Sequence, residues 1–249
     1  MFDLTGRVAA VTGATRGIGR AIAIALAEAG ADIALLQRNP ANKEVKEIIE
    51  SYNRKCEIIP CDLHDMEQVK AAIPEVLNKL GDVDILVNNV GIQSRAPAVD
   101  FTEEEWDRVI DVNLKSVWLL SQQAGRIMVG KKSGKIINLA SLLSFQGGIT
   151  VPAYAAAKGG IAQLTKALAN EWAKYNVNVN AIVPGYISTE MNTALINDEL
   201  RRRQILERIP AGRWGDAEDF KGAAVFLASK ASNYVHGHLL AVDGGWLGR

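Results

Sequence analysis

Three side chains with the chemistry for proton transfer occur close together in the sequence: Ser141, Tyr154 and Lys158. Tyr154 and Lys158 are four positions apart in a helical stretch, so their side chains share one face of the helix. An ammonium group beside a phenol lowers the phenol pKa from its usual value of about 10, because the positive charge favours the phenolate. The serine hydroxyl can hydrogen-bond the oxygen that Tyr154 protonates or deprotonates. The three residues therefore predict general acid–base chemistry on a carbonyl or hydroxyl group, with Tyr154 as the proton carrier.

A glycine-rich turn near the start of the chain predicts a dinucleotide site. An apolar run ends at Thr12-Gly13-Ala14-Thr15-Arg16-Gly17-Ile18-Gly19, and a helical stretch follows. Glycines in such a turn let backbone N–H groups approach a pyrophosphate, and the helix N-terminus adds a favourable dipole. The spacing is Gly-x3-Gly-x-Gly rather than the commoner Gly-x-Gly-x-x-Gly, so a purely structural turn is the alternative.

The residues after the second apolar run bear on the choice of nicotinamide cofactor. The acidic side chain that would bind a ribose 2′-hydroxyl is missing, and Gln37 stands in its place. Arg38 follows it, and Arg16 lies in the glycine turn. Because guanidinium groups bind phosphate oxygens well, Arg16 and Arg38 predict a 2′-phosphate and therefore NADP. Two solvated surface arginines are the alternative interpretation, and NAD is the alternative cofactor.

Short apolar runs alternate along the chain with longer helical stretches. Near-continuous valine, isoleucine and leucine runs are typical of strands buried on both faces, so the pattern predicts a doubly wound parallel sheet of the Rossmann type. We expect an α/β fold with three layers, built as a single domain over residues 1–249. The expected strands are 7–11, 31–36, 57–59, 83–87, 135–139, 177–183 and 239–242, and the expected helices are 17–30, 43–52, 65–80, 103–129, 154–175 and 217–228.

Residues 186–214 depart from this alternation and contain a basic cluster at 201–203. The segment follows the sixth expected strand, at the carboxyl edge of the sheet, where ligands bind in such folds. We expect it to be a loop with a short helix that covers the substrate.

The composition limits the classes to which the protein can belong. Lys and Arg number 28 and Asp and Glu number 28, so the basic excess of a nucleic-acid-binding protein is missing. The two cysteines, Cys56 and Cys61, are too few for a disulfide-rich scaffold or a structural zinc site, and we expect reduced thiols and no metal. The apolar run 21–29 is too short to cross a membrane, and we find no secretion signal. We expect a cytoplasmic protein that binds neither nucleic acid nor membrane.

Over nearly its whole length the chain resembles the short-chain dehydrogenases/reductases. The resemblance is carried by Thr12-Gly13-x3-Gly17-x-Gly19, Asn88-Asn89-Val90-Gly91, Asn113, Ser141, Tyr154-x3-Lys158 and Pro184-Gly185-x-Ile187-x-Thr189. Val90 departs from the alanine usual in the family and adds bulk beside the cofactor.

The resemblance implies a role for each of these residues. It makes Asn113, Ser141, Tyr154 and Lys158 the catalytic set, in which Lys158 holds the nicotinamide ribose and Asn113 positions a water in a proton relay. Asp62 and Leu63 would contact the adenine. The cofactor-binding residues expected in all are Gly13, Thr15, Arg16, Gly17, Ile18, Gly19, Arg38, Asp62, Leu63, Asn89, Gly91, Tyr154, Lys158, Pro184, Gly185, Ile187 and Thr189.

The second half of the chain is most similar to the 2-dehydro-3-deoxy-D-gluconate 5-dehydrogenases, also described as 2-deoxy-D-gluconate 3-dehydrogenases. The matching segments are 143–148, 169–173, 209–215 and 241–247. This resemblance implies hydride transfer between a nicotinamide and a secondary alcohol or ketone of a small sugar acid. Those enzymes mostly use NAD, which conflicts with Arg16 and Arg38; from the local charge we expect NADP.

A sugar acid carries a carboxylate, and a guanidinium group is a strong partner for it. We expect Arg95, after the fourth strand, to bind this carboxylate, and Gln146 to meet a sugar hydroxyl beside Ser141 and Tyr154. Arg213 is the rival anchor, in a setting more typical of a structural turn.

Two other functions stay open from the sequence. One is a 3-oxoacyl thioester reductase of the same fold, with residues 201–203 as a docking patch for a carrier protein. The other is a non-catalytic dinucleotide-binding protein, against which the complete set of catalytic residue types argues. The family resemblance also implies a homotetramer in which helices around 103–129 and 154–175 pair across two-fold axes. The C-terminal segment 243–249, with its apolar Trp246 and Leu247, is expected to pack at another axis.

Overall fold

The computed structural model describes the backbone of residues 1–249 and every side chain except those of Met191 and Ala194. A seven-stranded sheet forms its centre, in the order β3-β2-β1-β4-β5-β6-β7, and each neighbouring pair of strands is parallel. The strands are β1 Val8–Thr12, β2 Asp32–Gln37, β3 Cys56–Pro60, β4 Ile85–Asn88, β5 Gly134–Leu139, β6 Val177–Pro184 and β7 Leu239–Val242. The predicted doubly wound parallel sheet is confirmed.

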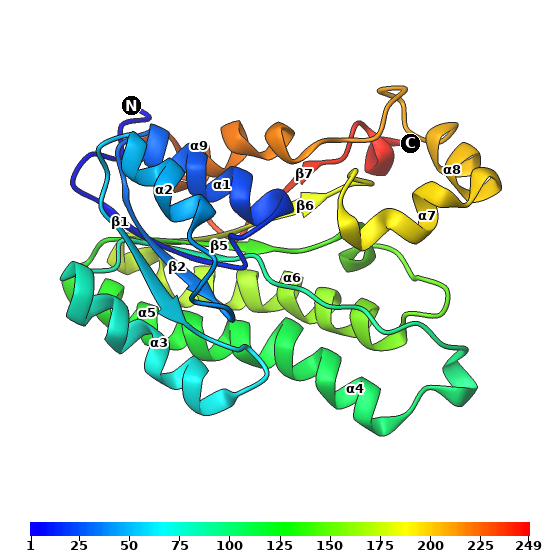
Figure 1. Cartoon of the computed structure of the whole chain (residues 1–249), viewed down its shortest axis with the longest axis horizontal. Helices are drawn as coiled ribbons and strands as arrows, with labels where there is room; N and C mark the ends of the chain where they lie inside the picture. Colours follow the sequence, from blue (N-terminus) through cyan, green and yellow to red (C-terminus); the bar gives the residue numbers. More distant parts are fainter.

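Helices cover both faces of the sheet and make three layers (Figure 1). One face carries α1, α2 and α9, and the other carries α3, α4, α5 and α6. The helices are α1 Gly17–Glu28, α2 Glu44–Ser51, α3 Met66–Leu80, α4 Glu103–Ile110, α5 Ser116–Lys131, α6 Pro152–Trp172, α7 Thr193–Asn197, α8 Glu199–Leu206 and α9 Lys221–Ala228. Every residue of β1 and of β4 is buried, because both faces of these strands are covered, and this explains their continuous apolar sequence.

The strand order reverses between β1 and β4, and this reversal positions the candidate site. In open α/β sheets, ligands bind at the carboxyl ends of the strands where the order reverses. The glycine turn leaves the carboxyl end of β1, and residues 89–96 leave the carboxyl end of β4. Both segments therefore meet at this edge.

The stretch expected to be one long helix over residues 103–129 is interrupted. A π-helical turn, Asp111–Lys115, separates α4 from α5. The apolar periodicity runs through the interruption, so the sequence pattern predicts a continuous helix. Such turns occur frequently at functional sites, and this one directs Asn113 into the interior, where it is fully buried.

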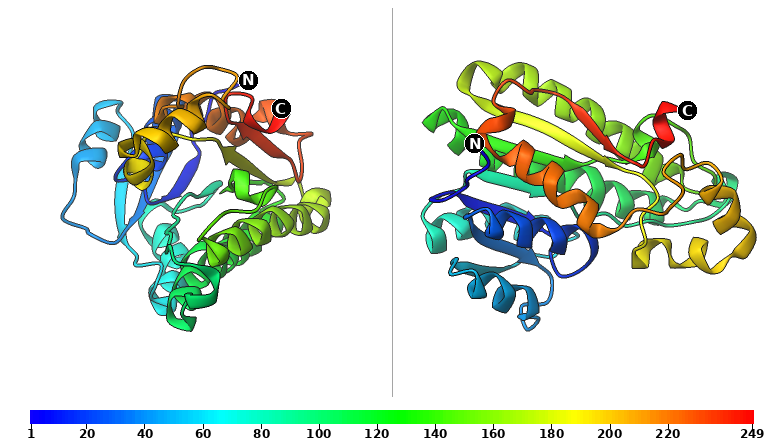
Figure 2. Two further views of the ribbon diagram at one scale, coloured as in Figure 1. Left: turned by 90° about the vertical axis from the view of Figure 1, so that its right-hand side faces the viewer. Right: turned by 90° about the horizontal axis from the view of Figure 1, so that it is seen from above.

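Residues 186–214 contain two short helices, α7 and α8, and not the single one expected. Asp198 explains the break, because its carboxylate accepts a hydrogen bond from the Arg201 backbone N–H and caps α8. The segment is closed at its base, where Ile187 pairs with Gly215. In Figure 2, α7 and α8 stand apart from the two helical layers at one end of the molecule.

A buried chain of hydrogen bonds fixes α6 against the sheet. Asn88 Nδ2 donates to Ser121 Oγ at 3.0 Å and to Asn138 Oδ1 at 2.9 Å, and Asn138 Nδ2 donates to Thr165 Oγ1 at 2.9 Å. These bonds join β4, α5, β5 and α6, and a buried polar network of this kind favours one relative placement of its elements.

None of the helices described here is long and apolar enough to span a membrane.

Candidate active site

The pair predicted from the Tyr-x3-Lys spacing lies together on α6. Tyr154 is 8% exposed and Lys158 is 3% exposed. Lys158 Nζ lies 5.7 Å from the centroid of the Tyr154 ring and donates a hydrogen bond to the main-chain oxygen of Leu139 at 2.6 Å. The ammonium group is therefore held at the carboxyl end of β5, beneath the tyrosine.

Ser141, the third predicted residue, follows β5, and its side chain acts to lower the pKa of Tyr154. Ser144, which was not predicted, fixes the turn that carries it. Ser144 Oγ donates to the main-chain oxygen of Lys158 at 2.6 Å and accepts from the Ser141 backbone N–H at 3.3 Å. Two serines at a capping spacing are the sequence signal that could have identified Ser144.

Burial dominates the pKa of Tyr154. Loss of water raises the pKa of this hydroxyl above its usual value, while hydrogen bonds with Ser141 and Gln93 and the charge of Arg95 oppose the rise. Burial also lowers the pKa of Lys158 to about 8. The opposing effect comes from Ser141 first, then from Gln93, and least from the charge of Arg95.

Asn113 clamps the loop that follows β4. Its Oδ1 accepts a hydrogen bond from the Ile92 backbone N–H, and its Nδ2 donates to the Ile92 carbonyl, both at 2.8 Å. A Cβ atom built on Gly91 would lie 3.6 Å from Lys158 Nζ and 3.8 Å from Asn113 Oδ1, so these three predicted residues meet at one place. Each of these two amide atoms has the capacity for a second hydrogen bond.

The same loop brings Gln93 and Arg95 to the tyrosine. Arg95 Nη2 donates to Gln93 Oε1 at 2.8 Å, and both side chains act to lower the pKa of Tyr154. Arg95 was predicted as a substrate residue, and its charge acts on Tyr154. Gln93 was not predicted, because a single glutamine in a loop carries no pattern.

The glycine turn has a backbone that side chains would obstruct. Gly13 and Gly17 have φ values of 65° and 55°, in the left-handed region that favours glycine. A Cβ atom on Gly19 would lie 2.4 Å from the Gly13 carbonyl oxygen. Asn89 Nδ2 donates to the same oxygen at 3.2 Å, and Val90 packs over Gly13, so both residues support the turn. An exposed backbone cradle at a helix N-terminus fits a pyrophosphate.

The end of β2 differs from the prediction in one respect. Gln37 is buried, and its Nε2 donates to the main-chain oxygens of Asn39 and Asn42, both at 2.8 Å. It therefore shapes the loop around Arg38 rather than facing a ribose. Arg38 itself is exposed at the carboxyl edge of the sheet.

Arg16 has an ion-pair partner, Glu190, that the sequence did not predict. Its guanidinium forms an ion pair with Glu190, and both side chains are well exposed, at 73% and 69%. The pair joins the glycine turn to the segment 186–214. Arg16 was predicted to share one phosphate with Arg38, and in this structure its partner is a carboxylate on the other side of the turn.

The other predicted cofactor residues lie at the carboxyl edge beside the turn. Thr15 and Ile18 are partly buried in the turn itself. After β3, Leu63 is buried, and the Asp62 carboxylate accepts from the His64 backbone N–H at 3.0 Å.

The end of β6 passes close to the glycine turn. Gly185 follows Pro184 and donates from its backbone N–H to the Val242 carbonyl at 3.0 Å. Ile187 is buried in the core, and a Cβ atom on Gly17 would lie 3.6 Å from Thr189 Cγ2. Thr189 is therefore placed directly against the turn.

Gln146 and Arg213 have partners within the chain. Gln146 Oε1 accepts from Trp246 Nε1 at 3.2 Å, which leaves the Gln146 NH₂ group as the donor for a substrate hydroxyl. Arg213 forms two bonds of 2.8 Å with the Asp219 carboxylate, so it is the structural residue that its sequence setting indicated.

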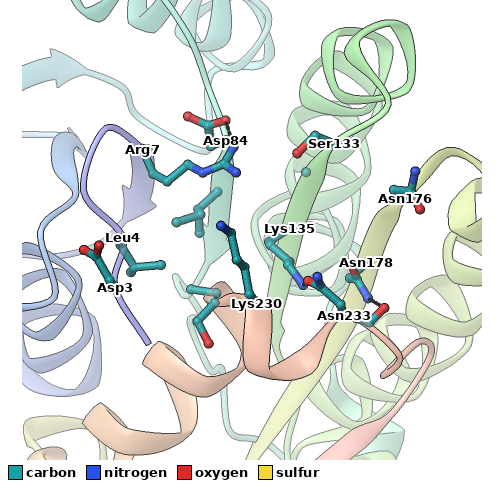
Figure 3. A pocket seen from close by; sticks show the side chains of 14 residues that line it. Asp3, Leu4, Arg7, Asp84, Ser133, Lys135, Asn176, Asn178, Lys230 and Asn233 are labelled. Atoms are coloured by element: carbon teal, nitrogen blue, oxygen red, sulfur yellow. Dashed lines mark hydrogen bonds and ion pairs between the residues drawn. The ribbon is translucent and has the colours of Figure 1, made fainter. Parts of the chain in front are cut away.

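A polar pocket of about 190 Å³ lies at the amino-terminal edge of the sheet, opposite Tyr154 (Figure 3). Arg7, Lys135 and Lys230 line it, and the Arg7 guanidinium bonds to Asp84 at 2.9 Å. Helices of a parallel α/β sheet end at this edge, and cations there offset the partial negative charge of their C-termini. The pocket contains none of the predicted site residues.

Comparisons with known proteins agree with this geometry. A family model described as enoyl-(acyl carrier protein) reductase matches residues 13–247. The 2-dehydro-3-deoxy-D-gluconate 5-dehydrogenase of Pseudoalteromonas atlantica is 54% identical, over 100% of this chain and 98% of the relative. The enzyme of the same name from Bacillus subtilis is 52% identical, over 100% of this chain and 97% of the relative.

Among solved structures, the chain is similar to a gluconate 5-dehydrogenase from Burkholderia cenocepacia in complex with NADP and tartrate. The TM-score is 0.95 and the identity 41%, with 100% of this chain and 98% of that one covered. With the Ser141, Tyr154 and Lys158 cluster placed beside the glycine turn, the chain belongs to the short-chain dehydrogenase/reductase family.

Proposed function

We propose that the protein is an NADP-dependent oxidoreductase that interconverts a secondary alcohol and a ketone on a small sugar acid. The observation that carries the proposal is the convergence of Ser141, Tyr154 and Lys158 at the sheet edge that holds the glycine turn. Relatives named for keto-deoxygluconate and gluconate support the sugar-acid substrate, and a structural neighbour that binds NADP supports the cofactor.

The residues of the glycine turn fit the pyrophosphate of NADP, because the turn leads into the N-terminus of α1, which is positive, and Gly13 and Gly17 have φ values that favour glycine. We propose that Arg38 and Arg16 hold the 2′-phosphate, Asp62 and Leu63 the adenine, and Ile187 and Thr189 the nicotinamide end. Arg16 would exchange Glu190 for the phosphate. The cofactor supplies the hydride chemistry; the chain supplies the proton chemistry and the orientation.

Tyr154 moves the proton in this proposal. Its hydroxyl gives a proton to the ketone oxygen in reduction, and its phenolate takes one from the alcohol in oxidation. Ser141 donates a hydrogen bond to the same substrate oxygen and fixes its distance from Tyr154. Lys158 would bind the nicotinamide ribose and, through a water held by Asn113, would carry the proton from Tyr154 to solvent in oxidation and from solvent to Tyr154 in reduction.

We propose that Arg95 binds the substrate carboxylate and Gln146 a substrate hydroxyl. Arg95→Ala is expected to raise KM for an acidic substrate about 10- to 100-fold, because a charge-assisted hydrogen bond contributes about 1.5–3 kcal/mol. The KM for NADP and turnover of an uncharged analogue should change little. Equal losses on charged and uncharged substrates would exclude Arg95 as the anchor.

A substrate panel tests the reaction itself. Wild-type protein is assayed with keto-deoxy sugar acids, their neutral analogues and a 3-oxoacyl thioester, by the absorbance change of the reduced cofactor. We expect the sugar acids to give the highest kcat/KM. Preference for the thioester would favour the carrier-protein reductase, and no turnover with any substrate would favour a non-catalytic binding protein.

We propose that residues 1–249 act as one domain in which the segment 186–214 covers the substrate. The pairing of Ile187 with Gly215 supports this, since it would let the two short helices close as a unit. We also propose a cytoplasmic location, where NADP is available.

A homotetramer is the proposed assembly. Trp106 on α4 and Trp118 on α5 are 40% and 37% exposed, which suits helices that pair across a two-fold axis. Trp246 is buried within its own chain and cannot contribute such a contact. Light scattering is expected to give about four times the chain mass of 26.9 kDa. A mass near 27 kDa in dilute solution would exclude the tetramer.

A further inference from the structure

Three neighbouring strands each bring one side chain to a common place beyond the carboxyl edge of the sheet. Gln146 follows β5, Tyr186 follows β6 and Trp246 follows β7, and these strands are adjacent in the sheet. The centroids of the Tyr186 and Trp246 rings lie 4.7 Å apart. Trp246 Nε1 donates a hydrogen bond to Gln146 Oε1 at 3.2 Å. The three side chains therefore form one cluster at the edge that also carries Ser141.

The indole of Trp246 is held from several sides. It is 4% exposed, and the Arg208 guanidinium lies over its ring, 4.0 Å from the centroid. The backbone that follows is fixed as well, because the Leu247 backbone N–H donates to the Asp243 carboxylate at 2.8 Å. An indole fixed in this way sets the direction in which its N–H can donate.

The turn that carries Trp246 is joined to the segment 186–214. The Ala211 backbone N–H donates to the Gly244 carbonyl at 3.0 Å. In Figure 1, the C-terminus lies at the same end of the molecule as α7 and α8. Trp246 is therefore placed between Gln146 and the segment that is proposed to cover the substrate.

The hydrogen bond with the indole decides how the Gln146 amide is turned. An indole N–H can only donate, so the amide oxygen must face Trp246. The NH₂ group then lies on the other side of the amide, and Gln146 Nε2 takes part in none of the hydrogen bonds between described residues. On that side the amide offers two N–H donors and no acceptor.

We propose that Trp246 is a positioning residue that fixes the Gln146 amide with its NH₂ group toward the substrate, so that this part of the site selects a hydroxyl oxygen as hydrogen-bond acceptor. The proposal rests on the proposed function, which places Gln146 against a substrate hydroxyl. It gives the C-terminal turn a part in substrate selection, which Trp246 exerts through Gln146.

A double-mutant cycle on Trp246 and Gln146 tests the proposal, with 2-dehydro-3-deoxy-D-gluconate as the probe substrate. Trp246→Phe keeps a ring against Tyr186 and removes the indole donor. It is expected to raise KM for the probe by about 3- to 10-fold, the range for one lost neutral hydrogen bond, while kcat and the KM for NADP change little. Gln146→Ala should raise KM at least as much. In the Gln146→Ala background, Trp246→Phe should have no further effect, because the group that the indole positions is gone.

Trp214→Phe is the matched control, because the Trp214 ring also packs against Tyr186, with their centroids 5.6 Å apart. Trp214 Nε1 is buried and has no hydrogen-bond partner among the described residues. The variant therefore removes an indole from the same cluster without removing a bond to Gln146. Its effect on KM should be the same in the wild-type and Gln146→Ala backgrounds.

Gln146→Glu separates the two sides of the amide. Its carboxylate can still accept from Trp246, but it replaces the NH₂ donors with an acceptor that carries a negative charge. We expect KM for the probe to rise more than in Gln146→Ala. Proton–nitrogen correlation spectra measure the indole bond without turnover. The Trp246 indole proton, identified by its loss in Trp246→Phe, should move to lower chemical shift in Gln146→Ala and not in Gln146→Glu.

Additive effects of Trp246→Phe and Gln146→Ala on KM would overturn the inference, and so would an unchanged Trp246 indole resonance in Gln146→Ala. Either result would leave the proposed function standing. Conversely, failure of wild type to turn over any sugar acid would overturn the proposed function, while the spectra would still decide whether Trp246 orients Gln146.

Discussion

Tyr154→Phe is expected to lose turnover by ~10²–10⁴-fold while NADP binding stays close to that of wild type. The change removes the hydroxyl oxygen and keeps the ring that packs against Val109 and Val151. Neither the glycine turn nor Arg38 contacts this oxygen in the proposed arrangement. Stopped assays for kcat and fluorescence titration for the NADP dissociation constant separate the two effects.

Tyr234→Phe is the matched control, because Tyr234 is fully exposed. It should retain wild-type turnover. A Tyr154→Phe protein that keeps more than about a tenth of wild-type kcat would lie outside the range for a lost acid–base group, and Tyr154 would not be the proton carrier. Loss of NADP binding together with turnover would instead indicate a structural role.

Arg38→Asp is expected to reverse the cofactor preference from NADP to NAD. The variant removes a guanidinium partner of the 2′-phosphate and introduces a carboxylate that accepts a hydrogen bond from a 2′-hydroxyl. Each lost charge-assisted bond costs about 1.5–3 kcal/mol, so kcat/KM for NADP should fall at least ~10-fold. Values of kcat/KM for both cofactors, in wild type and variant, measure the reversal.

Lys55→Asp makes the same change of charge just before β3, at the opposite edge of the sheet, and serves as the control. Its cofactor preference should match that of wild type. A wild-type protein that prefers NAD would contradict the proposal that Arg38 and Arg16 bind the 2′-phosphate. It would agree with the NAD preference expected from the resemblance to the 2-dehydro-3-deoxy-D-gluconate 5-dehydrogenases.

The strands were predictable because burial on both faces forces continuous apolar runs. Six of the seven expected ranges differ from the observed strands by one or two residues at one or both ends, and the seventh coincides with β7. That Tyr154 and Lys158 lie together was predictable, because the two residues have a helical spacing. The interruption at residues 111–115 was not, because a π-turn changes the hydrogen-bonding pattern without breaking the apolar periodicity.

Contacts between distant segments explain the rest of what the sequence missed. Arg16 and Glu190 are 174 positions apart, and no spacing rule brings them together. The bonds from Asn113 to the Ile92 backbone depend on the π-helical turn at residues 111–115, which was not predicted. Contacts between segments far apart in the sequence could therefore be found only from the structure, whereas contacts set by local spacing could be predicted from the sequence.

The buried ammonium of Lys158 has a consequence for the folding equilibrium. Its pKa falls from 10.5 to about 8 on folding, which corresponds to a cost of about 3 kcal/mol at neutral pH, where both the folded and unfolded forms are protonated. Between pH 8 and pH 10.5 the unfolded chain binds the proton more tightly than the folded one, so stability rises with pH through this window. Burial of the Lys158 ammonium therefore destabilises the fold at neutral pH, and alkaline solution removes this cost. A phenolate at Tyr154 would offset the same cost at neutral pH.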